Sequence, residues 1–70
     1  MKLCDAKPGK YRVISIEGGA HVKEKLLRQG VLPGKSIEVV TIQKQGPCVI
    51  QIGDTRMIIG SGMSTKIMVE

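Results

Sequence analysis

The spacing of apolar residues changes twice along the chain, from strand-like to helical and back to strand-like. Residues 10–17 (KYRVISIE) are rich in β-branched side chains and lie between the turn signals Pro8-Gly9 and Gly18-Gly19, which predicts a strand. Its apolar side chains are divided between two faces, Tyr11 and Val13 on one and Ile14 and Ile16 on the other. We therefore expect a strand that is bent or covered on both sides.

A helical stretch follows the second glycine pair. In residues 20–29 (AHVKEKLLRQ), Val22, Leu26 and either Ala20 or Leu27 are spaced as on one face of a helix, and charged residues take most of the remaining positions. Glu24 and Arg28 stand four residues apart, in the order that favours an ion pair on a helix surface. The pattern predicts one short helix.

Alternation returns after Pro33-Gly34 and predicts four more strands. They are residues 35–42 (KSIEVVTI), 48–52 (CVIQI), 55–59 (TRMII) and 66–69 (KIMV). Between them stand a loop at 43–47, a two-residue turn at Gly53-Asp54 with glycine first, and a break at 60–65 (GSGMST). Five short strands with one helix after the first fit a small, strongly bent β-barrel, which the last strand would close by pairing with an early one.

Length and composition restrict the core. Seventy residues make one domain, residues 1–70, with little apolar surface to bury. The chain has no Trp or Phe and one Tyr, so the core is expected to consist of Ile, Val, Leu and Met. Such a core fills a small barrel but does not enclose a large ligand, which argues against an enzyme with a deep pocket.

The chain is basic, with eleven Lys and Arg against six Asp and Glu and a net charge of +5. This balance favours contact with nucleic acid, anionic lipid or an acidic protein face, or it reflects only solvated lysines. The alternative function is therefore that of a basic β-barrel that binds RNA or DNA. Tyr11 is the one aromatic residue available for base stacking, so nucleic acid is not the expected partner.

No residues stand in a pattern typical of catalysis or metal binding. Cys4 and Cys48 are isolated, and His21 is the single histidine, so neither a zinc site nor a nucleophile with its base is predicted. The glycine-rich residues 60–65 lack the lysine of a phosphate-binding loop. We therefore expect no catalytic, cofactor-binding or metal-binding residues and a protein that is not an enzyme.

The cysteines and the start of the chain bear on the compartment. Cys4 and Cys48 could form one bridge, but two free thiols in a reducing compartment are the favoured interpretation. The first residues, MKLCDAKPGK, contain no apolar stretch like that of a signal peptide. No segment approaches the roughly 20 apolar residues that span a bilayer. We expect a cytoplasmic protein that does not insert into a membrane.

Residues 26–39 (LLRQGVLPGKSIEV) resemble the FeoA family, small proteins of the bacterial ferrous-iron uptake system. The resemblance extends over nearly the whole chain. Leu3 followed by Pro8-Gly9 is similar to the family's opening, Gly46-Pro47 with VIQIGD (49–54) to its central hairpin, and Ile67 with Val69 to its closing strand. Two places depart from the family pattern: Met63-Ser64 stand where members often carry an acidic residue and alanine, and Gly60 takes a position that is frequently basic.

The resemblance implies a fold and a partner. The fold would be mainly β, a small SH3-like β-barrel of about five strands with one short helix inserted after the first strand. The function would be that of a non-enzymatic accessory or regulatory protein of ferrous iron uptake. It would act in the cytoplasm beside FeoB, the membrane iron transporter with a GTP-binding domain. A free edge strand would also let two copies pair, so a homo-oligomer stays open.

The partner-binding residues are predicted at the end of the helix and in the loop after it: Leu26, Arg28, Val31 and Leu32. They combine apolar side chains with a basic one, a mixture enriched in the cores of protein interfaces. The other interpretation gives them no contact role. Leu26 would then belong to the core, as apolar residues of a helix face usually do, and Val31 and Leu32 would plug the end of the barrel. In either case Gly30 ends the helix and Pro33-Gly34 turns the chain.

Overall fold

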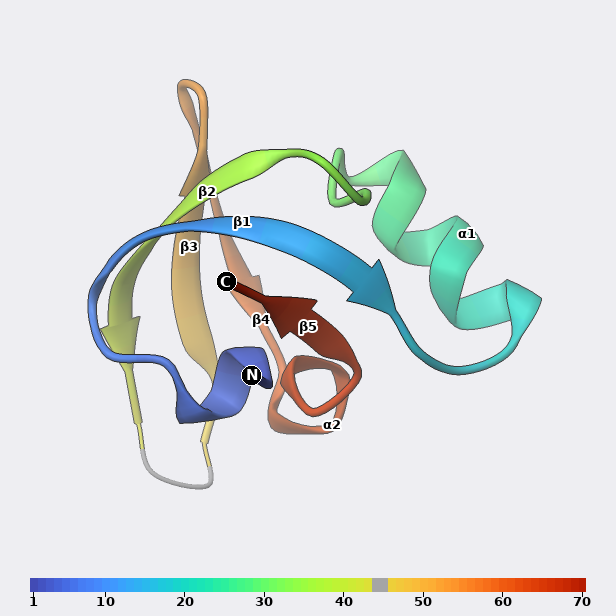
Figure 1. Cartoon of the computed structure of the whole chain (residues 1–70), viewed down its shortest axis with the longest axis horizontal. Coiled ribbons are helices and arrows are strands. Elements are labelled where there is room, and N and C mark those ends of the chain that lie inside the picture. The colour runs from blue at the N-terminus through green and yellow to red at the C-terminus, as the bar shows by residue number, and fades with distance from the viewer. Residues whose placement is uncertain (44–45) are drawn as a thin grey trace.

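The computed structural model describes residues 1–43 and 46–70 and shows one twisted sheet with a helix at its end (Figure 1). The strands are β1 (Gly9–Ile16), β2 (Ser36–Ile42), β3 (Cys48–Ile52), β4 (Thr55–Ile59) and β5 (Ile67–Val69). The helical elements are the 3-10 turn η1 (Leu3–Asp5) and the helices α1 (Ala20–Arg28) and α2 (Ser61–Ser64). All strands are antiparallel, in the order β4-β3-β2-β1-β5. The five predicted strands and the helix after the first are confirmed; part of the predicted loop at 43–47 lies outside the described residues.

Strand β1 is long and changes partner half-way (Figure 1). Its first residues, 9–12, pair with β2, and its last ones pair with β5. The register with β5 shifts between Val13 and Ser15, so Ile14 is the extra residue of a β-bulge. Because of this bulge Val13 and Ile16 both face the core, whereas the side chain of Ile14 is exposed. The bend that was expected from apolar residues on both faces is therefore present.

A second bulge lies between β2 and β3. The register shifts between Val39 and Thr41, which makes Val40 the extra residue. Ile37 and Val39 are buried before the shift, and Ile42 packs against the core after it. Each bulge bends its strand, so that apolar residues before and after the extra residue both reach the core.

The two outer edges of the sheet differ. The outer edge of β5 is covered by the start of the chain, where the amino group of Met1 donates to the carbonyl of Val69 (2.9 Å) and the N–H of Val69 donates back to Met1 (2.8 Å). β5 pairs with β1, as predicted for the last strand. β4 lies at the opposite edge, and the described residues show no pairing between β4 and β5. The closed ring of hydrogen bonds expected of a barrel is thus not detected.

The core consists of aliphatic side chains with one cysteine. Ile, Val and Leu are buried as predicted, whereas the methionines are not fully buried, and Met57 and Met63 pack against the core. Its buried members are Leu3, Ala6, Val13, Ile16, Leu26, Val31, Ile37, Val39, Cys48, Ile50, Ile59, Ile67 and Val69. They come from every strand, from α1 and from both the first residues and the loop after α1. The segment before β1 and the loop after α1 are therefore part of the packed structure.

Residues 60–65, predicted as a break, contain the single-turn helix α2. Gly60 is its N-cap, and the hydroxyl of Ser64 donates to the carbonyl of Ser61 (3.0 Å), which satisfies this buried polar group. The sequence does not predict this helix, because one turn is too short to show helical spacing. The small Ser64 fits the enclosed position, and Met63 packs against the core.

The end of α1 is a Schellman motif. The N–H of Val31 donates to the carbonyl of Leu26 and the N–H of Gly30 donates to Leu27, both at 2.9 Å, and Gly30 has a φ of 88°. Leu26 and Val31, the two residues that such a motif brings together, are both buried in the core. The predicted cap at Gly30 is confirmed, and it directs Val31 inward.

The following turn is fastened to β1. The N–H of Lys35 donates to the carbonyl of Leu32 (3.1 Å) across Pro33-Gly34, and Gly34 has a φ of 92°, as in a type II turn. The N–H of Gly34 donates to the carbonyl of Val13 (2.8 Å), and the N–H of Val13 donates to the carbonyl of Lys35 (2.9 Å). These bonds fix the loop against the sheet.

The cap makes a specific prediction for Gly30. Gly30→Ala is expected to lower the free energy of unfolding by about 1 kcal/mol, because an L-residue is strained at this positive φ although the space around it is open. Gly62→Ala is the control, since Gly62 also has open space but lies in α2 without a positive φ; it should leave stability unchanged or raise it slightly. Urea unfolding measures both, and equal losses would contradict the assignment of the cost to the left-handed conformation.

Candidate functional site

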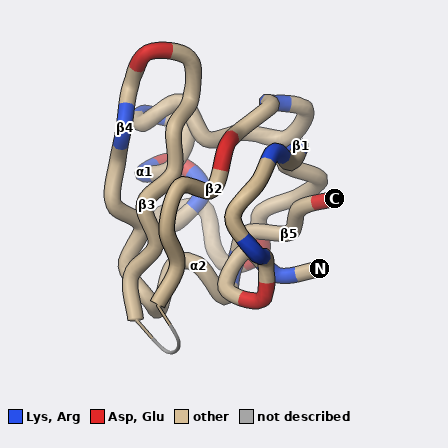
Figure 2. The backbone as a smooth tube through the Cα atoms, turned by 90° about the vertical axis from the view of Figure 1, so that its left-hand side faces the viewer, with Lys and Arg blue, Asp and Glu red and all other residues tan. Residues whose placement is uncertain are grey.

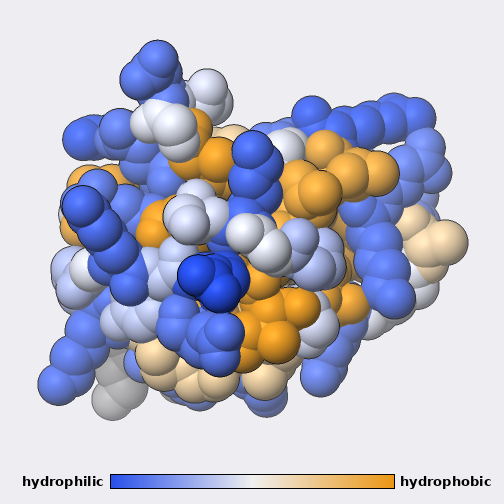
Figure 3. All heavy atoms as spheres, turned by 45° about the horizontal axis from the view of Figure 1, so that its top comes forward, coloured by the Kyte–Doolittle hydropathy of each residue, from blue (hydrophilic) through white to orange (hydrophobic). Residues whose placement is uncertain are grey.

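An open, mostly apolar groove lies between the end of β1, helix α1 and the loop after it. Its volume is about 280 Å³, and its lining includes Ile16, Lys23, Leu27, Val31, Leu32 and Pro33. Apolar side chains reach the surface on the side of the molecule where α1 lies, between charged ones (Figure 3). The Schellman motif and the turn at Pro33-Gly34 together form one wall of this groove.

The four predicted contact residues divide into two pairs. Leu26 and Val31 are 1% and 0% exposed, so their side chains belong to the core, and Val31 also contributes to the lining of the groove. Leu32 is half-buried in the groove wall. Arg28 is exposed and forms the predicted ion pair with Glu24, at 2.6 Å. Of the four, only Leu32 and Arg28 are thus placed for direct contact; the contact role itself stays a prediction.

The sequence interpretation missed Leu27 as a surface residue. It treated Leu27 as one possible member of the buried face of the helix, but the side chain is 56% exposed and lines the groove. The signal was the pair Leu26-Leu27, because neighbours on a helix lie about 100° apart and only one of them can face the core directly. Leu27 and Leu32 therefore provide the accessible apolar surface of the groove.

The surroundings of the groove are basic. Helix α1 carries Lys23, Lys25 and Arg28 and one acidic residue, Glu24. Lys23 lines the groove itself. The guanidinium of Arg28 and the carboxylate of Glu24 are both largely exposed, so their ion pair contributes little to stability. The groove thus combines an apolar lining with basic side chains on the adjacent helix α1.

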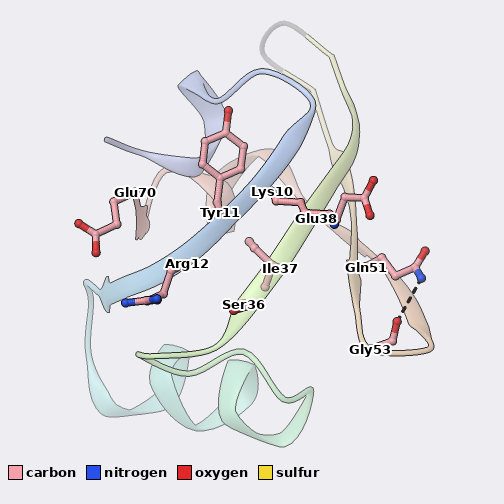
Figure 4. A pocket seen from close by; sticks show the side chains of 9 residues that line it. All are labelled: Lys10, Tyr11, Arg12, Ser36, Ile37, Glu38, Gln51, Gly53 and Glu70. Atoms are coloured by element: carbon pink, nitrogen blue, oxygen red, sulfur yellow. Dashed lines mark hydrogen bonds between the residues drawn. The ribbon is translucent and has the colours of Figure 1, made fainter.

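A larger and shallower hollow of about 610 Å³ lies across β1, β2 and the β3–β4 turn (Figure 4). Its charged lining residues are Lys10 and Arg12 from β1, Glu38 from β2 and Glu70 after β5. These charges are of both signs, which favours neither an anion nor a cation. The hollow therefore indicates no ligand class.

The cysteines are free thiols and differ in exposure. Cys4 is half-buried, while Cys48 is buried in the core. Burial raises the pKa of the Cys48 thiol, and the nearby Cys4 raises it further. A raised pKa keeps the thiol protonated and unreactive at neutral pH, so Cys48 acts as a small apolar residue.

Among residues 1–43 and 46–70, no three His, Cys, Asp or Glu side chains are grouped so that they could hold a metal ion. In the same residues, neither helix has the length and apolar character needed to cross a bilayer.

Comparison with known proteins places the chain in a family. The family model described as "FeoA domain" matches residues 1–70. The chain belongs to the FeoA domain family. A relative from Methanocaldococcus jannaschii, named "Putative Fe(2+) transport protein A", is 32% identical over 69 residues, which are 97% of this chain and 83% of that protein. The resemblance seen in the sequence is confirmed.

Solved structures agree with the FeoA assignment. The crystal structure of an iron uptake regulatory protein (FeoA) is 36% identical and superposes with a TM-score of 0.91, covering 99% of this chain and 93% of that one. The solution structure of iron(II) transport protein A from Clostridium thermocellum is 32% identical with a TM-score of 0.88, covering 100% of this chain and 44% of that one. The predicted SH3-like fold is therefore confirmed. FeoA proteins are non-catalytic accessory proteins, in agreement with the expectation that this chain is not an enzyme.

The raised pKa of Cys48 predicts how stability depends on pH. Below the ordinary pKa of a thiol, both the folded and the unfolded chain keep Cys48 protonated, and the full stability is present. As the pH rises further, the unfolded chain ionises first, so the free energy of unfolding falls until the pH passes the folded pKa. Urea unfolding at pH 7 and at about pH 10 should show this loss.

Variants separate Cys48 from other groups that titrate at alkaline pH. In Cys48→Ala the loss of stability between the two pH values should be smaller than in the unaltered chain, whatever the variant's stability at pH 7. Cys4→Ala is the matched control and should retain most of the loss. A Cys48→Ala variant with an unchanged pH dependence would refute this assignment.

Proposed function

We propose that this FeoA-family protein is a non-enzymatic accessory protein of ferrous iron uptake that regulates a FeoB-type membrane transporter. It acts in the cytoplasm, as one domain, by binding the cytoplasmic region of the transporter, which includes a GTP-binding domain. The names of the relatives, which refer to Fe(2+) transport and iron uptake regulation, support the process. The groove beside α1 is the observation that supports a contact function.

The composition of the groove is that of an interface. Leu27 and Leu32 are accessible apolar side chains of the groove, Lys23 also lines it, and the exposed Arg28 follows Leu27 on α1. Interface cores are enriched in apolar and arginine residues and depleted of lysine, and their rims are polar. The proposed partner surface is therefore an apolar patch with acidic residues around it.

The groove is also held in shape before any partner binds. Val31 is buried beneath it, and the hydrogen bonds of Gly34 and Lys35 with Val13 attach the loop to β1. A partner that contacts Leu32 would therefore not have to order this loop, which lowers the entropic cost of association.

Nucleic-acid binding, the alternative from the sequence, has no structural observation in its favour. The hydroxyl of Tyr11, the single aromatic residue, donates to the carbonyl of Lys7 (2.8 Å), and its ring packs against the core. Tyr11 is thus engaged within the protein and does not offer a free platform on which bases could stack.

The proposal is tested by Leu32→Asp in a pull-down with the full-length transporter. A carboxylate in the groove would be desolvated against an apolar and acidic partner surface, so binding should weaken about tenfold or more. Thr41→Asp is the control, because it adds the same charge at an exposed position at the opposite end of β2. The control should bind like the unaltered protein. Normal binding by a folded Leu32→Asp variant would rule out the groove as the contact.

Arg28 gives a second, electrostatic test. Arg28→Ala should change the free energy of unfolding by less than about 0.5 kcal/mol, because its ion pair with Glu24 is exposed. Binding to the transporter should nevertheless weaken and become less sensitive to salt, since a basic contact to an acidic surface is lost. Affinities measured at two salt concentrations check this, and an unchanged salt dependence would exclude Arg28 from the interface.

A further inference from the structure

The β3–β4 hairpin determines which backbone groups of β4 point outward. Ile52 and Thr55 pair across the two-residue turn at Gly53-Asp54, where Gly53 has a φ of 58°. In such a hairpin the pair beside the turn exchanges hydrogen bonds, and bonded and non-bonded pairs then alternate. Every second residue of β4 thus bonds β3. The N–H and C=O groups of Arg56 and Ile58 point away from β3, toward the outer edge of the sheet.

This outer edge has no backbone partner in the described parts of the chain. None of the backbone hydrogen bonds outside regular helices and strands involves residues 55–59. Figure 2 shows β4 at the margin of the molecule, with β3 and β2 inside it. The edge of β5, in contrast, is covered by Met1. Residues 55–59 also contain no proline, and their register with β3 is uninterrupted by a bulge, so two common devices that protect a sheet edge are missing from β4.

Two exposed side chains, Ile58 and Arg56, determine the chemistry of this edge. Ile58 is 70% exposed, the highest value among the exposed large apolar residues. The Nε of Arg56 donates to the Oε1 of Gln51 (3.0 Å), and the Nε2 of Gln51 donates to the carbonyl of Gly53 (3.1 Å). These bonds orient the guanidinium and leave its two terminal nitrogens available. Among the described residues, Arg56 has no carboxylate within ion-pair distance.

We propose that the edge of β4 binds an extended segment of another protein, which adds to the sheet as a further strand. The backbone of this segment bonds the outward groups of Arg56 and Ile58. Its side chains include a carboxylate beside Arg56 and an apolar residue beside Ile58, two positions apart on the same face. This interaction goes beyond the proposed binding at the groove, because it uses the backbone of a different element.

The charges favour such a segment over a second copy of this chain. In an antiparallel self-paired dimer centred on the two β4 strands, Arg56 and Ile58 would face Ile58 and Arg56 of the other copy, and no residue of β4 is acidic. Each copy also carries a net charge of +5, so two copies repel each other. An acidic strand instead pairs its carboxylate with the guanidinium and fixes the register.

The test is a titration of the isotope-labelled full chain with two capped seven-residue peptides, followed by NMR. The first has threonine throughout except for a glutamate and a valine two positions apart, and the second has lysine in place of the glutamate. The glutamate peptide should shift the amide signals of Arg56 and Ile58 and slow their hydrogen exchange. The affinity of the lysine peptide should be lower than that of the glutamate peptide by a factor of about ten or more. Shifts centred on the groove, equal binding of both peptides, or no binding would overturn the proposal.

Two variants make the result specific. Arg56→Glu should reverse the preference, so that the lysine peptide binds more tightly than the glutamate peptide. Ile58→Pro removes an outward N–H that β3 does not use, which an edge strand tolerates, and it should abolish binding of the glutamate peptide. Ile14→Lys, at an exposed isoleucine of β1, is the control that should bind normally.

The remaining outcomes are also decisive. If Ile58→Pro fails to fold, the reversal in Arg56→Glu still distinguishes pairing at this edge from general charge attraction. An Arg56→Glu variant that keeps the original preference would overturn the proposal. So would a dimer of the free protein in sedimentation that Ile58→Lys abolishes, because the second copy would then be the occupant. Loss of transporter binding in Leu32→Asp does not enter this test, so the two proposals can fail separately.

Discussion

The position of the loop and of α1 depends on Val13, where β1 leaves β2 and joins β5. The backbone of Val13 bonds Gly34 and Lys35 of the loop, its side chain is buried, and it pairs with Val69 of the last strand. One residue thus connects the middle of the chain to its end. The bulge directly after it turns β1 toward α1. Ser15 and Ile16, which follow the bulge, line the groove, so the course of β1 after the bulge sets one wall of it.

A small aliphatic core explains why the groove exists. Helix α1 is attached to the sheet through few buried residues, Leu26 in the helix and Val31 after its cap. A nine-residue helix is not stable by itself, so these contacts and the Schellman motif must hold it. The core is too small to accept every apolar residue of the helix and loop. Leu27 and Leu32 therefore remain at the surface beside the buried pair, and the surface they form can act in binding.

The sequence predicts the strands and α1 because alternation and glycine or proline punctuation are local signals. It does not reveal the bulges, since one extra residue leaves composition and average spacing unchanged. The apolar residues on both faces of β1 are only an indirect sign of the bulge in that strand. The helix α2 is too short for periodicity. Leu26 and Val31 could not be assigned to core or surface, because burial of Val31 follows from the geometry of the helix cap. The exposure of Leu27 follows from which of two adjacent leucines faces the sheet.

The two proposed contact surfaces, the groove and the β4 edge, would recognise partners through different interactions, and this affects what each could select. The groove presents side chains, so its specificity depends on apolar shape and on charge beside it. The edge presents backbone groups that fit any extended chain, so selectivity there must come from Arg56 and Ile58. An edge with two outward residues offers few hydrogen bonds, and a segment bound to it alone would dissociate readily. If one partner engaged both surfaces, the effective concentration of the second contact would strengthen the pair well beyond either one.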